Sequence, residues 1–146
     1  MGKKVIYQDM MLPLDGSKEA EKSLDDVIPL LKATKGELLL LHVIELFSLF
    51  ERDREAEYRI LVEKAEEYLN KIKARVESEG IVAKTVIGTG KAAVEICKHA
   101  ERDDVDIVLM SPHGAGGILD WAIGSVAEKV VRHSPKPVLV IRQTVS

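Results

Sequence analysis

The chain has 146 residues, a formal net charge of −3 and 46% hydrophobic residues, which is the size and composition of one globular domain. Aromatic residues make up only 4% and no long basic run is present, so the sequence argues against a surface that binds nucleic acid or an anionic membrane. The only cysteine, Cys97, cannot form an intrachain disulfide, and no apolar run is long enough to span a bilayer. We therefore expect a single cytoplasmic domain over residues 1–146, without a nucleic-acid or membrane partner.

Continuous apolar runs alternate along the chain with segments of helical spacing. Continuous runs predict strands covered on both faces, whereas apolar residues recurring every three or four positions predict helices with one inward face. In chain order, these patterns predict a strand over 10–14, a helix over 17–33, a strand over 38–44, a helix over 55–79, a strand over 81–87, a helix over 91–102, a strand over 106–110, a helix over 124–133 and a strand over 138–141. This order predicts a doubly wound, Rossmann-like α/β fold with a five-stranded parallel sheet and helices on both faces.

Turn and breaker residues mark the boundaries of these elements. Residues 15–17, Asp-Gly-Ser, combine a turn signal with a helix-capping serine, and Gly36 closes the first helix. Pro29 should kink that helix or start a new turn. Gly88-Thr89-Gly90 should break the third strand, and residues 45–54 fit either a loop or a short amphipathic segment.

The segment between the fourth strand and the last helix is the most informative. It begins Ser111-Pro112-His113-Gly114 and ends at Gly124-Ser125. A helix start offers free N–H groups and a favourable dipole to an anion, and glycines let a backbone approach phosphate oxygens closely. In sheets of this kind, ligands bind at the carboxyl ends of the strands where the strand order reverses. The plainer alternatives are a flexible glycine turn and, for Asp15, a role limited to the turn.

The spacing of Gly114, nine further residues, and then Gly124 and Ser125 resembles the nucleotide-binding motif of universal stress proteins, G-x2-G-x9-G-[S/T]. The likeness covers nearly the whole chain: residues 12–17, 39–44 and 124–141 all resemble that family, and the last stretch is the most specific.

The resemblance implies a binding role for each matching position. Asp15 would bind the ribose hydroxyls, with Pro13 and Leu14 beside the base, and the backbone of Val43 would bind adenine. The complete set of expected binding residues is Pro13, Leu14, Asp15, Val43, Met110, Ser111, His113, Gly114, Gly124, Ser125 and Val126. The expected ligand is ATP with Mg²⁺. The family commonly forms dimers through the last strand, here Val138 to Ile141.

Serine replaces the first glycine of the motif at position 111. If this position needs a positive φ, serine costs about 1 kcal/mol, which weakens a micromolar site without abolishing it. A side chain facing the phosphates would instead block binding.

Two main functions follow from the resemblance. The leading hypothesis is an ATP-binding sensor or signalling protein of the stress response. The alternative, motivated by Ser111, is a universal stress protein that binds no nucleotide and acts as a homodimeric protein-interaction module. A more distant third, an adenylating enzyme, would need substrate-binding segments for which 146 residues leave little room.

The sequence predicts at most slow ATP hydrolysis. Gly88-Thr89-Gly90-Lys91 lacks the spacer and the hydroxyl residue of a phosphate-binding loop, and no base is evidently placed to activate water. The four histidines do not pair at metal-ligand spacing. We therefore assign neither catalytic nor metal-binding residues.

Overall fold

Five parallel strands form the centre of the computed structural model, which describes residues 6–46, 51–112 and 123–142. The strands are β1 (Met10–Pro13), β2 (Leu38–Ile44), β3 (Ala83–Thr89), β4 (Ile107–Met110) and β5 (Val138–Val140). The helices are α1 (Lys18–Lys22), α2 (Leu24–Thr34), α3 (Glu51–Glu77), α4 (Ala92–Ala100) and α5 (Ser125–His133). The predicted α/β architecture with a five-stranded parallel sheet is thus confirmed.

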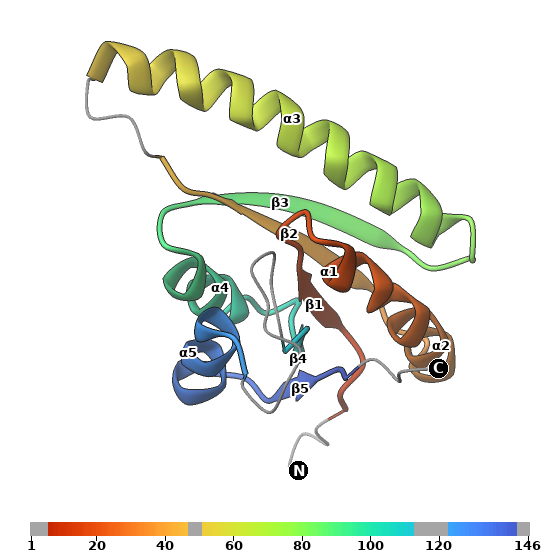
Figure 1. Ribbon diagram of the computed structural model, residues 1–146. Coiled ribbons are helices and arrows are strands. Elements are labelled where there is room, and N and C mark those ends of the chain that lie inside the picture. Colours follow the sequence, from red (N-terminus) through yellow and green to blue (C-terminus); the bar gives the residue numbers. More distant parts are fainter. Residues whose placement is uncertain (1–5, 47–50, 113–122, 143–146) are drawn as a thin grey trace.

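The strand order is β3-β2-β1-β4-β5, which puts β1 in the middle of the sheet. Helices α1, α2 and α3 cover one face, and α4 and α5 cover the other (Figure 1). Successive side chains of β1 point to opposite faces, so Met10 and Leu12 pack with the first group of helices and Met11 with the second. Because both faces are covered, the strands carry the continuous apolar runs seen in the sequence.

The predicted helix over residues 17–33 is two helices, α1 and α2, separated at Ser23. The Ser23 side chain is fully buried and donates a hydrogen bond to the carbonyl of Ala20. A serine hydroxyl that bonds to the preceding turn competes with the regular helical pattern. Pro29 was expected to cause the interruption, but it lies inside α2.

Helix α3 begins at Glu51, earlier than predicted, and is 27 residues long. Its inward face is the predicted one, and Ala65, Leu69, Ile72 and Val76 are buried. Within the described ranges, none of the helices combines the length and the hydropathy needed to cross a bilayer.

Strand β3 runs through Gly88 to Thr89, whereas the sequence analysis expected the strand to end before Gly88. Gly88 pairs with Val43 in the parallel register of β2 and β3. A Cβ atom added at Gly88 would lie 3.2 Å from Cε1 of His99, so this glycine marks the close approach of α4 and not the end of the strand.

The turn after α2 also differs from the expectation that Gly36 ends the helix. The residue with left-handed backbone is Lys35, at φ 58°. A Cβ atom at Gly36 would lie 1.6 Å from the carbonyl oxygen of Gln8, so this position requires glycine because the segment before β1 passes directly over it.

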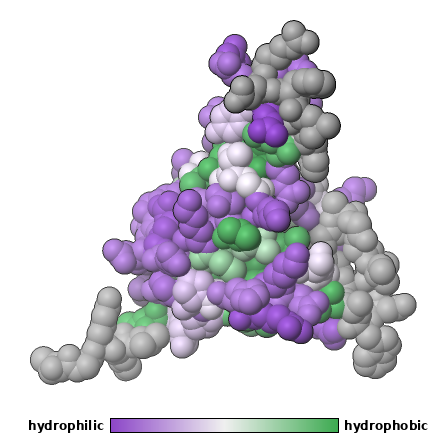
Figure 2. All heavy atoms as spheres, turned by 90° about the vertical axis from the view of Figure 1, so that its left-hand side faces the viewer, coloured by the Kyte–Doolittle hydropathy of each residue, from purple (hydrophilic) through white to green (hydrophobic). Residues whose placement is uncertain are grey.

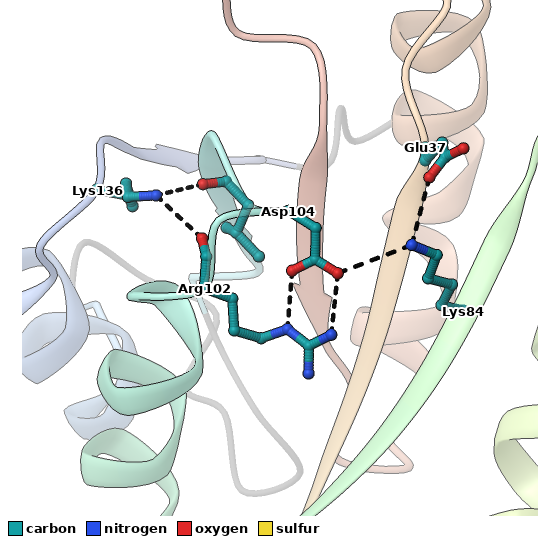
Figure 3. A network of polar contacts seen from close by, with 6 residues as sticks. Glu37, Lys84, Arg102, Asp104 and Lys136 are labelled. Atoms are coloured by element: carbon teal, nitrogen blue, oxygen red, sulfur yellow. Dashed lines mark hydrogen bonds and ion pairs between the residues drawn. The ribbon is translucent and has the colours of Figure 1, made fainter.

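Charged side chains connect the amino ends of the strands (Figure 3). The Arg102 guanidinium binds both carboxylate oxygens of Asp104, at 2.8 and 2.9 Å. This bond is the main reason why the pKa of Asp104 lies below its usual value. Lys84 lies between Glu37 and Asp104, at 3.6 and 3.9 Å, and Lys136 donates to the Arg102 carbonyl. Exposed pairs of this kind contribute at most about 1 kcal/mol each, and they lie at the edge of the sheet opposite the strand ends described next.

Candidate functional site

The strand order reverses between β1 and β4, and this defines the candidate site. From β1 the chain continues to β2 and β3 on one side, and it returns to form β4 and β5 on the other. The connections leaving β1 and β4 therefore diverge at the carboxyl ends of these strands, and such a point is where open α/β sheets bind ligands. Asp15 follows β1, and Ser111 and Pro112 follow β4.

The turn after β1 holds an exposed carboxylate at this edge. Oδ1 of Asp15 accepts a hydrogen bond from the backbone N–H of Ser17, at 2.9 Å. Gly16 between them has φ +86°, which explains the glycine at this turn. The Ser17 hydroxyl in turn caps α1 by accepting from the N–H of Ala20, at 3.1 Å. The Asp15 side chain is therefore attached to a helix start as well as to a strand end.

Neighbouring backbone atoms belong to β1 and β2. The N–H of Leu14 donates to the carbonyl of Leu41 at 2.8 Å, so the polar backbone groups of Leu41 face β1. Those groups alternate sides along a strand, and Val43 therefore also turns its N–H and C=O toward the β1 side. Pro13 pairs with Leu41, so by the same register Asp15 lies beside Val43.

The start of α5 is attached to the end of β4. The N–H of Gly124 donates to the carbonyl of Pro112 at 2.6 Å. Gly124 is the N-cap of α5 and has no side chain that could cap the helix, and a helix start of this kind can offer N–H groups to an anion. Ser125 and Val126 lie in this first turn and are exposed. Met110, the last residue of β4, is buried.

The structure thus brings most of the expected binding residues to one edge of the sheet. These are Pro13, Leu14 and Asp15 after or within β1, Val43 in β2, Met110 and Ser111 at the end of β4, and Gly124, Ser125 and Val126 at the start of α5. His113 and Gly114 lie outside the described residues. What each residue binds remains a prediction.

Figure 2 views the molecule from the side on which β2 and β3 end, and it shows a small hydrophobic area framed by hydrophilic residues. Hydrophobic side chains exposed on the helices of that side include Val94 of α4, 61% exposed, and Val126 of α5, 38% exposed.

Two residues beneath the β1 turn were not singled out as site residues from the sequence. Nδ1 of His42 lies 2.7 Å from the Leu14 carbonyl oxygen, and since a carbonyl only accepts, Nδ1 carries the proton. The Tyr68 ring of α3 packs edge-on against His42, with ring centroids 5.9 Å apart. In the sequence, the only indication of a role for His42 and Tyr68 was that each is an aromatic residue with a polar group at an otherwise apolar position.

The Tyr68 hydroxyl is buried and makes no hydrogen bond of normal geometry within the described part of the chain. Burial raises the pKa of Tyr68 to about 12, and the carboxylates of Glu21 and Asp15 act in the same direction. The nearby Gly16 amide lowers the pKa but does not offset these effects. The hydroxyl therefore stays protonated throughout the physiological pH range.

Residues 6–46, 51–112 and 123–142 contain no group of three or more His, Cys, Asp or Glu side chains that could hold a metal ion.

The sheet order and the reversal between β1 and β4 define a doubly wound α/β protein. The family model described as "Universal stress protein family" matches residues 6–142, and the chain belongs to this family. Universal stress protein MJ0577 of Methanocaldococcus jannaschii is 32% identical over an alignment 157 positions long, which covers 95% of this chain and 97% of that protein.

Solved structures agree with this assignment. The structure of the MJ0577 protein matches with a TM-score of 0.81 at 34% identity and covers 97% of this chain and 100% of that one. A universal stress protein family protein from Arabidopsis thaliana with AMP bound has a TM-score of 0.70 at 19% identity, covering 94% and 93%. A universal stress protein in complex with cAMP has a TM-score of 0.65 at 19% identity, covering 94% and 98%. At these lower identities the likeness concerns the fold.

The raised pKa of Tyr68 predicts a pH dependence of stability. The folded protein favours the neutral hydroxyl, whereas the unfolded chain ionises near the ordinary value of 10. The contribution of this group is therefore fully present below pH 10 and is lost as the pH rises toward 12. In a tyrosinate absorbance titration, one of the three tyrosines should ionise near pH 12. This late step should be absent from a Tyr68→Phe variant, and its persistence there would contradict the assignment.

Proposed function

We propose that this chain binds an adenine nucleotide, ATP with Mg²⁺, at the carboxyl ends of β1 and β4 and acts as a sensor or signalling protein in a stress response. The main support is the 2.6 Å hydrogen bond from Gly124 to Pro112, which holds the start of α5 against the end of β4. The neighbouring strand, β1, leads into the turn that carries Asp15. An anion-attracting helix start and a sugar-binding carboxylate then lie on one edge.

In this proposal each part of the nucleotide meets a suitable group. The exposed Asp15 carboxylate accepts hydrogen bonds from the ribose hydroxyls, and the first N–H groups of α5 bind phosphate oxygens. Gly124 lets those oxygens approach the backbone, and the Ser125 hydroxyl is available to phosphate or to its Mg²⁺. The backbone of Val43, facing the β1 side, binds the adenine edge.

The relatives support the class of ligand at the level of the fold. The structures with cAMP and with AMP show that this fold accommodates adenine nucleotides in two other proteins. The ion is proposed to arrive with the phosphates, because Mg²⁺ usually binds through substrate phosphates and few protein ligands. Occupancy of the site would then change the conformation of the chain or a surface that a partner recognises.

A calorimetric titration with ATP, ADP and AMP tests the proposal directly. We expect measurable binding and an affinity about tenfold lower for Asp15→Asn, because the amide still accepts the Ser17 hydrogen bond but loses the charge that strengthens bonds to the ribose. Asp26→Asn, an exposed aspartate in the first turn of α2, is the matched control and should bind like the parent. The absence of both heat and thermal shift at millimolar nucleotide would end the proposal.

A second candidate function rests on Ser111, the residue that stands where the family motif has its first glycine. Under this alternative the chain binds no nucleotide. The Ser111→Gly variant separates the two: binding by the variant but not by the parent would favour the alternative. Ser111 does not have the positive φ that would make serine strained, since Lys35 is the non-glycine residue with positive φ in the described part of the chain. We therefore expect equal affinity, which would show that the serine is tolerated.

A homodimer through Val138 to Ile141 is proposed for either function. β5 is the last strand of the sheet on its side, and Leu139 is 40% exposed there. An exposed apolar edge strand is a ready template for pairing with a second chain. Twofold pairing of this edge would bury Leu139 together with Val131 of α5, which is also exposed.

Sedimentation of a Leu139→Glu variant tests this dimer. A charge at the centre of the paired edge should convert the dimer to monomer at micromolar concentration. Val94→Glu, on the exposed surface of α4, should leave the state of assembly unchanged. A parent protein that sediments as a monomer would refute the dimer.

A further inference from the structure

Among the described residues, the Tyr68 hydroxyl is a buried side-chain polar group for which packing gives no explanation. Its oxygen is inaccessible to solvent and makes no hydrogen bond of normal geometry among the described residues, although the backbone amide of Gly16 lies close enough to lower its pKa. Nearly all buried polar groups in folded proteins are paired, and leaving one unpaired costs free energy that a phenylalanine ring would avoid. The remainder of the ring packs against the core formed with α1, α2 and β2, which phenylalanine would do equally well.

Several groups around this hydroxyl belong to the turn after β1. In addition to burial, the carboxylates of Glu21 in α1 and of Asp15 raise the pKa of this hydroxyl, and a backbone hydrogen-bonding interaction with Gly16 lowers it. From β2, the His42 ring packs against Tyr68 while its Nδ1 donates to the Leu14 carbonyl. Tyr68 and His42 therefore support, from beneath, the turn that carries the expected ribose-binding carboxylate.

The chemistry of the hydroxyl identifies its natural partner. It remains protonated, so it is available as a donor, and the anionic groups acting on it are the carboxylates of Asp15 and Glu21. Glu21 is attached to α1, whereas Asp15 belongs to the candidate site. A hydrogen bond from a hydroxyl to a carboxylate is charge-assisted and is among the stronger hydrogen bonds in proteins.

We propose that Tyr68 is a positioning residue of the nucleotide site, whose buried hydroxyl donates a hydrogen bond to the Asp15 carboxylate when that carboxylate binds the ribose. The inference rests on the proposed function. Through this bond one carboxylate oxygen is oriented by the protein while the carboxylate accepts from the sugar, which reduces the freedom that binding must otherwise restrict. Tyr68 thus gives the site its preference for a nucleotide with ribose hydroxyls.

The test compares two ligands and two tyrosines. Titrations use ATP and 2′,3′-dideoxy-ATP with the parent protein, with Tyr68→Phe and with Tyr58→Phe, since Tyr58 lies on the same helix but is exposed. Tyr68→Phe should weaken ATP binding about tenfold and leave dideoxy-ATP binding unchanged. Tyr58→Phe should change neither affinity. Without nucleotide, the melting temperature of Tyr68→Phe should equal or exceed that of the parent, because a buried unpaired hydroxyl has been removed.

Other results would overturn the inference. If Tyr68→Phe binds ATP with the affinity of the parent, or if it lowers the affinities for ATP and dideoxy-ATP equally, Tyr68 does not act through the ribose. If it lowers the melting temperature and leaves the affinities unchanged, its hydroxyl has a purely structural partner. If the parent protein binds neither ligand, the proposed function itself fails. If the parent binds ATP and Tyr68→Phe binds it equally well, the proposed function stands and only the inference about Tyr68 fails.

A second readout does not depend on a variant. The NMR signal of the Tyr68 ring carbon bonded to oxygen, in protein labelled with ¹³C-tyrosine, should shift on addition of ATP and not on addition of dideoxy-ATP. A ring that only packs in the core would show no such difference, and equal spectra with the two ligands would overturn the inference.

Discussion

The parallel pairing of β1 with strands on both of its sides is the constraint on which the remaining architecture depends. Met10 lies opposite Leu38 of β2 and opposite Ile107 of β4. Because β1 is central and fully covered, the chain must leave it toward one edge of the sheet and return on the other. That reversal is sufficient to place the turn at Asp15 beside the end of β4.

Polar side chains hold the two edges of the sheet in different ways. At the amino edge, the Asp106 carboxylate accepts from the N–H groups of Gln8 and Asp9, at 3.2 and 2.9 Å, and fixes the entry into β1. At the carboxyl edge, the exposed residue Asp15 accepts a hydrogen bond from the N–H of Ser17 within the turn after β1. The first edge therefore stabilises the sheet, while the second holds in defined positions the groups that the proposed ligand would contact, as preorganised sites require.

Local patterns in the sequence predicted the elements and their inward faces, and the structure confirmed them to within a few residues at most ends. The failures had tertiary or side-chain causes: the hydroxyl of Ser23 interrupts the first helix, and pairing with β2 carries β3 through Gly88. Of the candidate site, Asp15 and Gly124 were recognisable because turn and motif residues are local signals. His42 and Tyr68 were missed because their role depends on a contact between β2 and α3 that no local pattern reports.

By itself, the sequence determined that strands and helices alternate, that the strands are buried on both faces, and that glycine, aspartate and serine mark the turns. These properties follow from side-chain periodicity and backbone preferences within a few residues. Only the tertiary structure decided the order β3-β2-β1-β4-β5 and the meeting of β1, β4 and α5 at one edge. Strands that are apolar on both faces are equally suited to any neighbour, so their order depends on the crossovers and the packing of the helices.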